Sequence, residues 1–329
     1  MHLAAFIFRR LLQGALVMLV ISAAAFAVRD ELGDPLRELV GESVSEEERE
    51  LLREEMGLRD PFAVQYWRFL KNAARGDFGD SYFFKRPALD VILEKFPATF
   101  ELVFAASLII FLISAPAGVY CALRPHSAGA RAIMFFSILG ISVPVFLFAI
   151  LLIYLFSVQL GWLPSYGRGD IAPLFGVLWE SNFATWSGLA HLLLPAAALS
   201  SIMLPLFIRL IRAEMAESLS ADYIRFARAK GLHPRRIYFV HALKNAMLPV
   251  ITVGGVQIGS LLAYTILTES VFQWPGMGFL FLEAVNRVDP PLIVAYLIVA
   301  GLIFVAVNTA ADVVCTLANP AVRLGDEKA

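Results

Sequence analysis

Apolar residues recur in long runs along this chain, and the polar residues gather in the segments between the runs. After the first hundred residues, the apolar runs cover about 100–123, 132–158, 189–211, 247–268 and 292–317. A helix of about twenty apolar residues is long enough to cross the hydrocarbon core of a bilayer. The pattern therefore predicts five transmembrane helices in this part of the chain.

A further apolar run near the start of the chain extends to Val28 and follows Arg9 and Arg10. The sequence Ala25-Phe26-Ala27 resembles the cleavage site of a secretory signal peptide, which is the alternative interpretation. The run is long for the apolar part of a signal peptide, and more apolar runs follow it. We therefore predict that residues 1–28 form an uncleaved first transmembrane helix.

Residues 29–98 form a charged segment that holds 16 acidic and 11 basic residues. Ser45 and the three glutamates after it have the form of a capping box, which begins a helix that Gly57 can end. Beyond Pro61, one face of a second helix carries Phe62, Tyr66, Phe69 and Ala73. We expect a small helical element outside the membrane that packs on the bundle.

Composition and charge fix the class of protein and its orientation. Hydrophobic residues make up 59% of the 329 residues, against about 45–50% in soluble domains. Cytoplasmic loops of membrane proteins are enriched in lysine and arginine. One side of the predicted membrane carries 14 of the basic residues in short loops, and the other side carries only Arg168 and Arg287. This bias places both termini and the segment from Arg209 to Val250 in the cytoplasm.

The expected fold is an all-α integral membrane protein with six transmembrane helices and the 29–98 element outside the cytoplasm. Residues 99–329 then form a five-helix core that contains a cytoplasmic segment at 212–246. The formal net charge of −1 gives no reason to expect a nucleic-acid partner. The surroundings that we expect are the lipid bilayer.

Few residues within the predicted spans suit catalysis or metal binding. Two cysteines and five scattered histidines lack the spacing of a disulfide framework or a metal site, so no metal is expected. The mid-span polar residues are mostly neutral, namely Gln257, Tyr264 and Asn308. They either line a path for a polar solute or form hydrogen bonds between helices. A membrane-anchored enzyme would need a nucleophile or an acid–base pair, and the sequence shows neither.

The chain also lacks the phosphate-binding loop G-x4-G-K-[ST]. We therefore expect no ATP site of that kind in this chain, and any ATP-driven transport must take its energy from a partner. The alternative is a secondary carrier or channel that works without ATP. Such carriers usually hold buried carboxylates or broken helices near the middle of the membrane, and the spans here are nearly free of charged residues.

The cytoplasmic segment predicts two short helices. Ser220, Ala221 and Asp222 can cap a helix that runs to Lys230, and Gly231 ends it. His233-Pro234 then begins a second helix that leads into the next span. A short helix at the membrane surface can insert into a groove on another protein. A basic loop that serves topology alone is an equally good interpretation of the same residues.

The motif in this segment resembles the cytoplasmic signature of ABC-transporter permease subunits of the dipeptide/oligopeptide/nickel branch. It reads Asp222, Tyr223, Ile224, Arg225, Ala227, Arg228, Ala229, Lys230, Gly231 and Leu232, then His241, Ala242, Leu243, Asn245, Ala246, Leu248 and Pro249. The usual Glu-Ala-Ala opening is replaced by Arg225-Phe226-Ala227, as is normal for this branch.

The likeness extends over nearly the whole chain and resembles the first of the family's two permeases. The motifs in order are Gly33-Asp34-Pro35, Gly57-Leu58-x-Asp60-Pro61, Gly76-Asp77-Phe78-Gly79-Asp80-Ser81, Ser142-x-Pro144-x-Phe146, Leu163-Pro164, Glu269-x2-Phe272-x2-Pro275-Gly276-x-Gly278 and Asn319-Pro320-x2-Arg323. The chain departs from the family at Val288, where arginine is common. This departure bears only on a local contact outside the membrane.

The resemblance implies a permease of a binding-protein-dependent importer in the bacterial cytoplasmic (inner) membrane, carrying di-/oligopeptides or related solutes. Implied partners are a second permease, one or two cytoplasmic ATPase subunits that hold ATP and Mg²⁺, and an extracytoplasmic solute-binding protein. The 29–98 element and the 269–291 loop would meet the binding protein. No cofactor is expected on this chain itself. The residues implied to couple to an ATPase are Asp222, Tyr223, Arg225, Ala227, Arg228, Ala229, Gly231, Leu232, His233 and Pro234.

Overall fold

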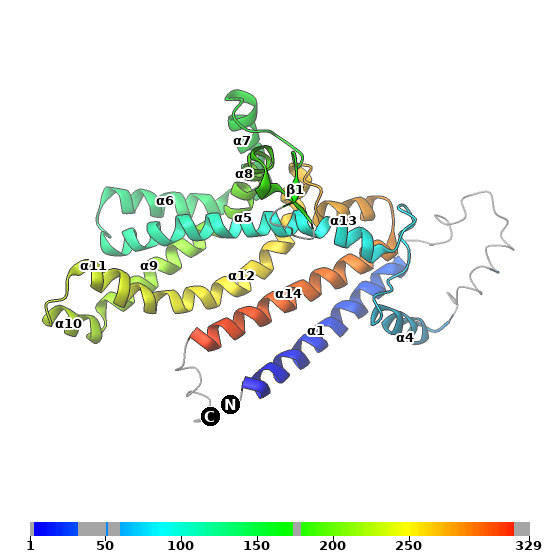
Figure 1. Ribbon diagram of the computed structural model, residues 1–329, viewed down its shortest axis with the longest axis horizontal. Coiled ribbons are helices and arrows are strands. Elements are labelled where there is room, and N and C mark those ends of the chain that lie inside the picture. The colour runs from blue at the N-terminus through cyan, green and yellow to red at the C-terminus, as the bar shows by residue number, and fades with distance from the viewer. Residues whose placement is uncertain (1–2, 32–50, 52–59, 174–178, 319–329) are drawn as a thin grey trace.

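The computed structural model describes residues 3–31, 51, 60–173 and 179–318. Nearly all of the regular structure in these residues is helical (Figure 1). The elements are α1 (Leu3–Glu31), α4 (Phe62–Ala73), α5 (Ala88–Leu123), α6 (Ala128–Ser142), α7 (Val145–Leu152), η1 (Ile153–Gln159), β1 (Ala172–Pro173), β2 (Glu180–Ser181), η2 (Asn182–Ala184), α8 (Trp186–Ser200), α9 (Leu204–Ser220), α10 (Asp222–Ala229), α11 (Pro234–Arg236), η3 (Ile237–Ala242), α12 (Leu243–Val271), α13 (Met277–Asn286) and α14 (Pro290–Ala318).

Within the described residues, three helices are long and apolar enough to cross a membrane, covering Ala88–Leu123, Pro234–Val271 and Pro290–Val313. Two bent pairs raise this number to five if each pair is one span. They are α6 with α7 and η1, and α8 with α9, which meet at a bend of 60°. The apolar part of α1, Leu12–Ala27, is shorter than these spans. The structure thus gives three to five candidate spans.

Helix α5 begins well before the apolar run that predicted it. The run starts near residue 100, whereas the helix starts at Ala88, directly after Pro87. Proline tends to precede or open a helix because its missing N–H is not needed there. The first turns of α5 carry Asp90 and Glu94, so hydropathy alone could not locate the start of the helix.

Helix α5 packs against α8, α9 and α12 and lies at the centre of the largest core cluster. Leu102, Ala106, Leu199 and Ile211 in that cluster are fully buried. Gly118 allows α9 to come close, because a Cβ added there would lie 2.7 Å from Cβ of Ile211. Small residues at such contacts are typical of helix packing in membranes.

Helices α1 and α14 pack along each other in the same manner. A Cβ added at Gly14 would lie 2.8 Å from Val305, and one added at Gly301 would lie 2.8 Å from Ile21. Arg10 Nη2 pairs with Asp312 Oδ2 at 2.9 Å across the same contact. The first helix is therefore part of the bundle.

The face predicted for α4 packs on α1. Phe26 of α1 is buried, and its ring centroid lies 5.4 Å from that of Phe62 and 5.2 Å from that of Phe69. The Tyr66 hydroxyl lies 2.7 Å from Ser22 Oγ. The helix expected between Ser45 and Gly57 falls outside the described residues, as do the motifs at Gly33 and Asn319.

Candidate functional site

The segment predicted to be cytoplasmic forms the expected short helix, α10. It begins after Ala221 and is followed by Lys230 and Gly231. Gly231 has φ +75°, a conformation that glycine adopts at little cost. No side chain caps the start of α10, and the Ser220 hydroxyl donates instead to the Glu217 carbonyl. Asp222 stands in the first turn, where its charge is favourable to the helix dipole.

Helix α10 has one buried face and one exposed face. Ile224 and Ala227 are buried against the bundle, and Phe226 is 62% exposed. Lys230 Nζ lies 4.6 Å from the centre of the Phe226 ring, within the range of a cation–π contact. The other exposed residues of the motif are Asp222, Tyr223, Arg225, Arg228, Ala229, Gly231, His233 and Pro234, and Leu232 is half-buried. The exposed face is thus basic with aromatic side chains between the charges.

One buried hydroxyl joins α10 to both of its neighbours. Ser218 Oγ, near the end of α9, donates to the Ala242 carbonyl of η3 at 3.1 Å. The single hydrogen of the Ser218 hydroxyl is used in that bond, so its oxygen accepts from the Tyr223 hydroxyl of α10 at 2.5 Å. The Ser218 hydroxyl therefore links α10 to α9 and to the helix that leads into α12.

The second predicted helix of the segment is continuous with a span. His233 Nδ1 accepts a hydrogen bond from the Arg235 N–H, and Pro234 begins α11. The chain then passes through η3 into α12. The helix that starts at Pro234 therefore runs without a break to Val271, as one candidate span.

The three mid-span polar residues occupy different surroundings. Gln257 lines a cavity of about 300 Å³ between α5, α9 and α12. Tyr264 is 41% exposed, and the buried Asn308 Oδ1 has no hydrogen-bond partner among the described residues. Tyr264 and Asn308 do not line this cavity. The structure thus brings Gln257 alone of the three to the cavity.

The motif that begins at Glu269 forms a buried junction of three helices. Thr99 Oγ1 on α5 donates to Glu269 Oε1 at 2.7 Å and accepts from the Met277 N–H of α13 at 2.8 Å. Glu269 Oε2 accepts from the Phe279 N–H at 2.8 Å. A Cβ added at Gly276 would lie 2.4 Å from the Glu269 carboxyl group. The glycine in the motif therefore makes room for the carboxylate.

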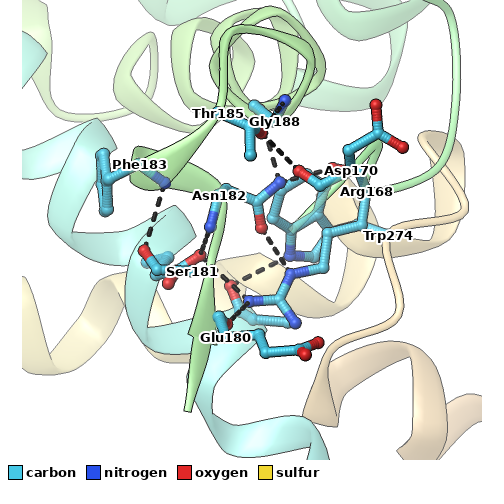
Figure 2. A network of polar contacts seen from close by, with 11 residues as sticks. Arg168, Asp170, Glu180, Ser181, Asn182, Phe183, Thr185, Gly188 and Trp274 are labelled. Atoms are coloured by element: carbon cyan, nitrogen blue, oxygen red, sulfur yellow. Dashed lines mark hydrogen bonds and ion pairs between the residues drawn. The ribbon is translucent and has the colours of Figure 1, made fainter. Parts of the chain in front are cut away.

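A second polar network holds the loop between η1 and α8 (Figure 2). Arg168 Nη2 pairs with Glu101 Oε2 at 3.1 Å, and the Arg168 side chain also donates to the Asn182 side chain. The Asn182 N–H donates to the same carboxylate oxygen at 3.1 Å. Glu101 is 2% exposed and Asn182 is fully buried. The loop is thus bound to the N-terminal half of α5.

Sequence reasoning did not find this network. Its residues lie 67 and 81 positions apart from Glu101, so no local pattern joins them. A signal was present, because a lone carboxylate inside an apolar span needs a partner. Arg168 is one of only two basic residues in the short loops on the predicted outer side.

Metal binding finds no support in the part of the chain that the structure describes. No three residues of the types histidine, cysteine, aspartate and glutamate form a group there that could hold a metal ion. Cys121 is a buried free thiol.

Comparison with known families matches almost the full length of the chain. Residues 114–324 match the family described as binding-protein-dependent transport system inner membrane component. Residues 3–103 match the N-terminal part of such membrane components. The two matched ranges do not overlap, and the motif at 222–249 lies wholly within the range 114–324.

Individual relatives agree with these families. The chain is 35% identical to the oligopeptide transport system permease protein AppB of Bacillus subtilis, over 98% of this chain and 100% of that protein. It is 38% identical to the di/tripeptide transport system permease protein DppB of Pseudomonas aeruginosa, over 88% and 90%. It is 34% identical to the glutathione transport system permease protein GsiC of Escherichia coli, over 97% and 98%.

One solved structure shares the fold. It is an inward-facing conformation of the MetNI methionine ABC transporter, similar with a TM-score of 0.53 at 16% identity. The similarity covers 70% of this chain and 96% of that one. At this identity the likeness concerns the fold alone.

Proposed function

Because this chain belongs to the family of inner membrane components of binding-protein-dependent transport systems, we propose that it is a permease subunit of an ATP-driven importer for di-/oligopeptides or related solutes. It is a multi-pass protein of the inner membrane. The three similar permeases match this chain over 90% or more of their length, and their names refer to oligopeptides, di/tripeptides and glutathione. These names support peptides as the solute class.

The proposed topology has six spans with both termini in the cytoplasm. Three single helices and two bent pairs supply five spans, and α1 supplies the sixth. Gly14 and Gly301 support this role of α1, because they let it pack closely on α14. The count of basic residues in short loops favours the cytoplasm for α10, and it favours the outside for α4 and the loop held by Arg168.

The observation that carries the proposal is the geometry of α10. Its apolar face is already buried, whereas Phe226 and a set of basic side chains remain exposed beside a glycine turn. A short helix whose free face carries an exposed aromatic ring and basic side chains can dock in a groove on a partner. We assign that groove to a cytoplasmic ATPase subunit, which would bind ATP and Mg²⁺ in place of this chain.

The connections of α10 support a mechanical role for the chain. Ser218 ties α10 to α9 and η3, and α9 packs along α5 while η3 continues into α12. A push on α10 would therefore tilt the helices that border the cavity. The implied assembly contains a second permease, one or two ATPase subunits and an extracytoplasmic binding protein.

The test is peptide uptake into vesicles that contain the complete assembly with its binding protein. We expect uptake of a labelled dipeptide that needs ATP and persists when an ionophore collapses the ion gradients. A secondary carrier would show the opposite dependence. The ionophore would abolish its uptake, and the absence of ATP would not affect it. That result would overturn the proposal.

A further inference from the structure

The cavity beside Gln257 borders the middle of α12. Gln257 is 14 residues from either end of α12, which covers Leu243–Val271, so it stands about 21 Å from both ends at 1.5 Å per residue. The volume is about 300 Å³, near the lower end of the range for small-molecule sites. The side chains around the cavity come from α5, α9, α12 and α14.

The walls of this cavity are mainly apolar and partly adaptable. Phe207, Ile258 and Leu261 line it, together with Met203 and Met247. Methionine is unbranched and flexible, so its side chain can follow apolar groups of different shape. Proteins that bind many related ligands use methionine-rich surfaces in this way. The walls therefore suit apolar groups whose shape varies from one ligand to another.

One polar group in the cavity lacks a partner. Ser114 lines the cavity and is 1% exposed, and its hydroxyl has no hydrogen-bond partner among the described residues. Leaving a buried hydroxyl unsatisfied is costly. The acyl chain of a lipid could fill the apolar space but offers no acceptor for this hydroxyl. A peptide carries a carbonyl acceptor next to each apolar side chain.

We infer that this cavity receives an apolar side chain of the peptide in transit, while the Ser114 hydroxyl donates to a carbonyl of the peptide backbone. The inference rests on the proposed function and adds a place inside the membrane where the permease itself favours apolar peptides. The permease and the binding protein would then both contribute to the selection of peptides. Small peptides such as Ala-Ala would leave most of the cavity unfilled.

Gly254 offers a way to fill the cavity without disturbing the backbone. It lines the cavity, and a Cβ added there would lie 3.6 Å from the Phe207 ring, an ordinary contact. Gly140 on α6 is a matched control outside the cavity, with the added Cβ 3.5 Å from Pro205. The variants to compare are Gly254→Leu and Gly140→Leu.

The experiment measures ATP-dependent uptake of Leu-Leu and Ala-Ala by the complete assembly. Each variant is compared with the wild type for each peptide, so that the preference of the binding protein cancels. For Gly254→Leu we expect about a tenfold loss for Leu-Leu, because apolar pockets discriminate by this order. Uptake of Ala-Ala should change by less than about twofold, and Gly140→Leu should leave the ratio of the two peptides unchanged.

Ser114→Ala provides a second readout that does not depend on a larger side chain. Removing an unpartnered buried hydroxyl should leave the melting temperature unchanged or raise it. Uptake of Leu-Leu should nevertheless fall by about fivefold, the size expected for one lost hydrogen bond. Unchanged uptake in this variant would overturn the role of the Ser114 hydroxyl.

The outcomes separate the cavity from the proposed function. The inference about the cavity is wrong if the wild-type assembly imports both peptides and Gly254→Leu changes the uptake of both by the same factor. Equal loss for both peptides is also the result expected for a cavity that holds lipid. If the wild-type assembly imports neither peptide with ATP present, the proposed function fails, and the inference fails with it.

Discussion

At the scale of single residues, the Glu269 carboxylate determines how three helices meet. It accepts from Thr99 on α5 and from the Phe279 N–H on α13, while it belongs to α12. It is fully buried, and buried acceptors without donors are strongly unfavourable. The junction is therefore stable only while both donors and the carboxylate are present.

Replacing Glu269 with alanine should destabilise the protein by about 3 kcal/mol, because two buried donors lose their acceptor. The measurement is the free energy of unfolding in mixed detergent and SDS micelles. The control is Glu283→Ala, which removes an ion pair with Arg287. The side chains of Arg287 and Glu283 are 41% and 35% exposed. The control should cost less than about 1 kcal/mol. Equal losses for the two variants would contradict the role of Glu269.

At the scale of elements, the loop that carries Arg168 is fixed to α5 by charge as well as by hydrogen bonds. Glu101 Oε2 accepts hydrogen bonds from the Arg168 guanidinium and from the Asn182 N–H. Because Glu101 is buried, losing its cationic partner leaves a charge that water cannot reach. The ion pair is thus one of several contacts that hold this loop in place.

Replacing Arg168 with alanine should therefore lower the free energy of unfolding by about 3 kcal/mol. The double variant Arg168→Met with Glu101→Leu should recover part of that loss, because it removes the buried charge but leaves the buried Asn182 N–H without its acceptor. The measurement is the same detergent titration applied to both variants. A double variant less stable than Arg168→Ala would show that the charge on Glu101 is not the cause.

These elements also show what the sequence could predict. Asp222, Gly231 and Pro234 are local signals, and they located α10 and the start of the next helix. Each of the five later apolar runs falls within one long helix or one bent pair of helices. The contacts of Arg168 with Glu101 and of Glu269 with Thr99 join distant parts of the chain. No periodicity encodes such pairs, because they depend on how the helices pack.

At the scale of the whole molecule, the described ends of the chain and α10 lie toward one end of the bundle (Figure 1). Helices α4 and α13 lie toward the other end. This separation agrees with the distribution of basic residues in the short loops, most of which belong to the end that carries α10. The proposed topology places that end in the cytoplasm.

Single cysteines test this topology in a variant whose Cys121 and Cys315 are replaced by serine. Trp186 is 88% exposed on the proposed outer side, and His126 is exposed on the proposed cytoplasmic side. A membrane-impermeant maleimide should label Trp186→Cys in intact cells. It should label His126→Cys only after the cells are permeabilised. The reverse pattern would contradict the proposed orientation.

The most direct test of the central claim compares two glycines. Gly231 beside α10 and Gly161 in the outer loop both have positive φ, at +75° and +62°, and no described atom lies within 4 Å of a Cβ added at either. Phenylalanine at either position is strained to a similar degree, so only the surroundings in the assembly distinguish the two variants.

The measurement is the amount of peptide imported per ATP hydrolysed by the complete assembly. For Gly231→Phe we predict a fall of at least about tenfold, because a bulky side chain at the docking turn disturbs an interface where a few residues carry most of the binding energy. Gly161→Phe should stay near the wild-type value. Wild-type coupling in Gly231→Phe would contradict the claim that transport is driven through α10.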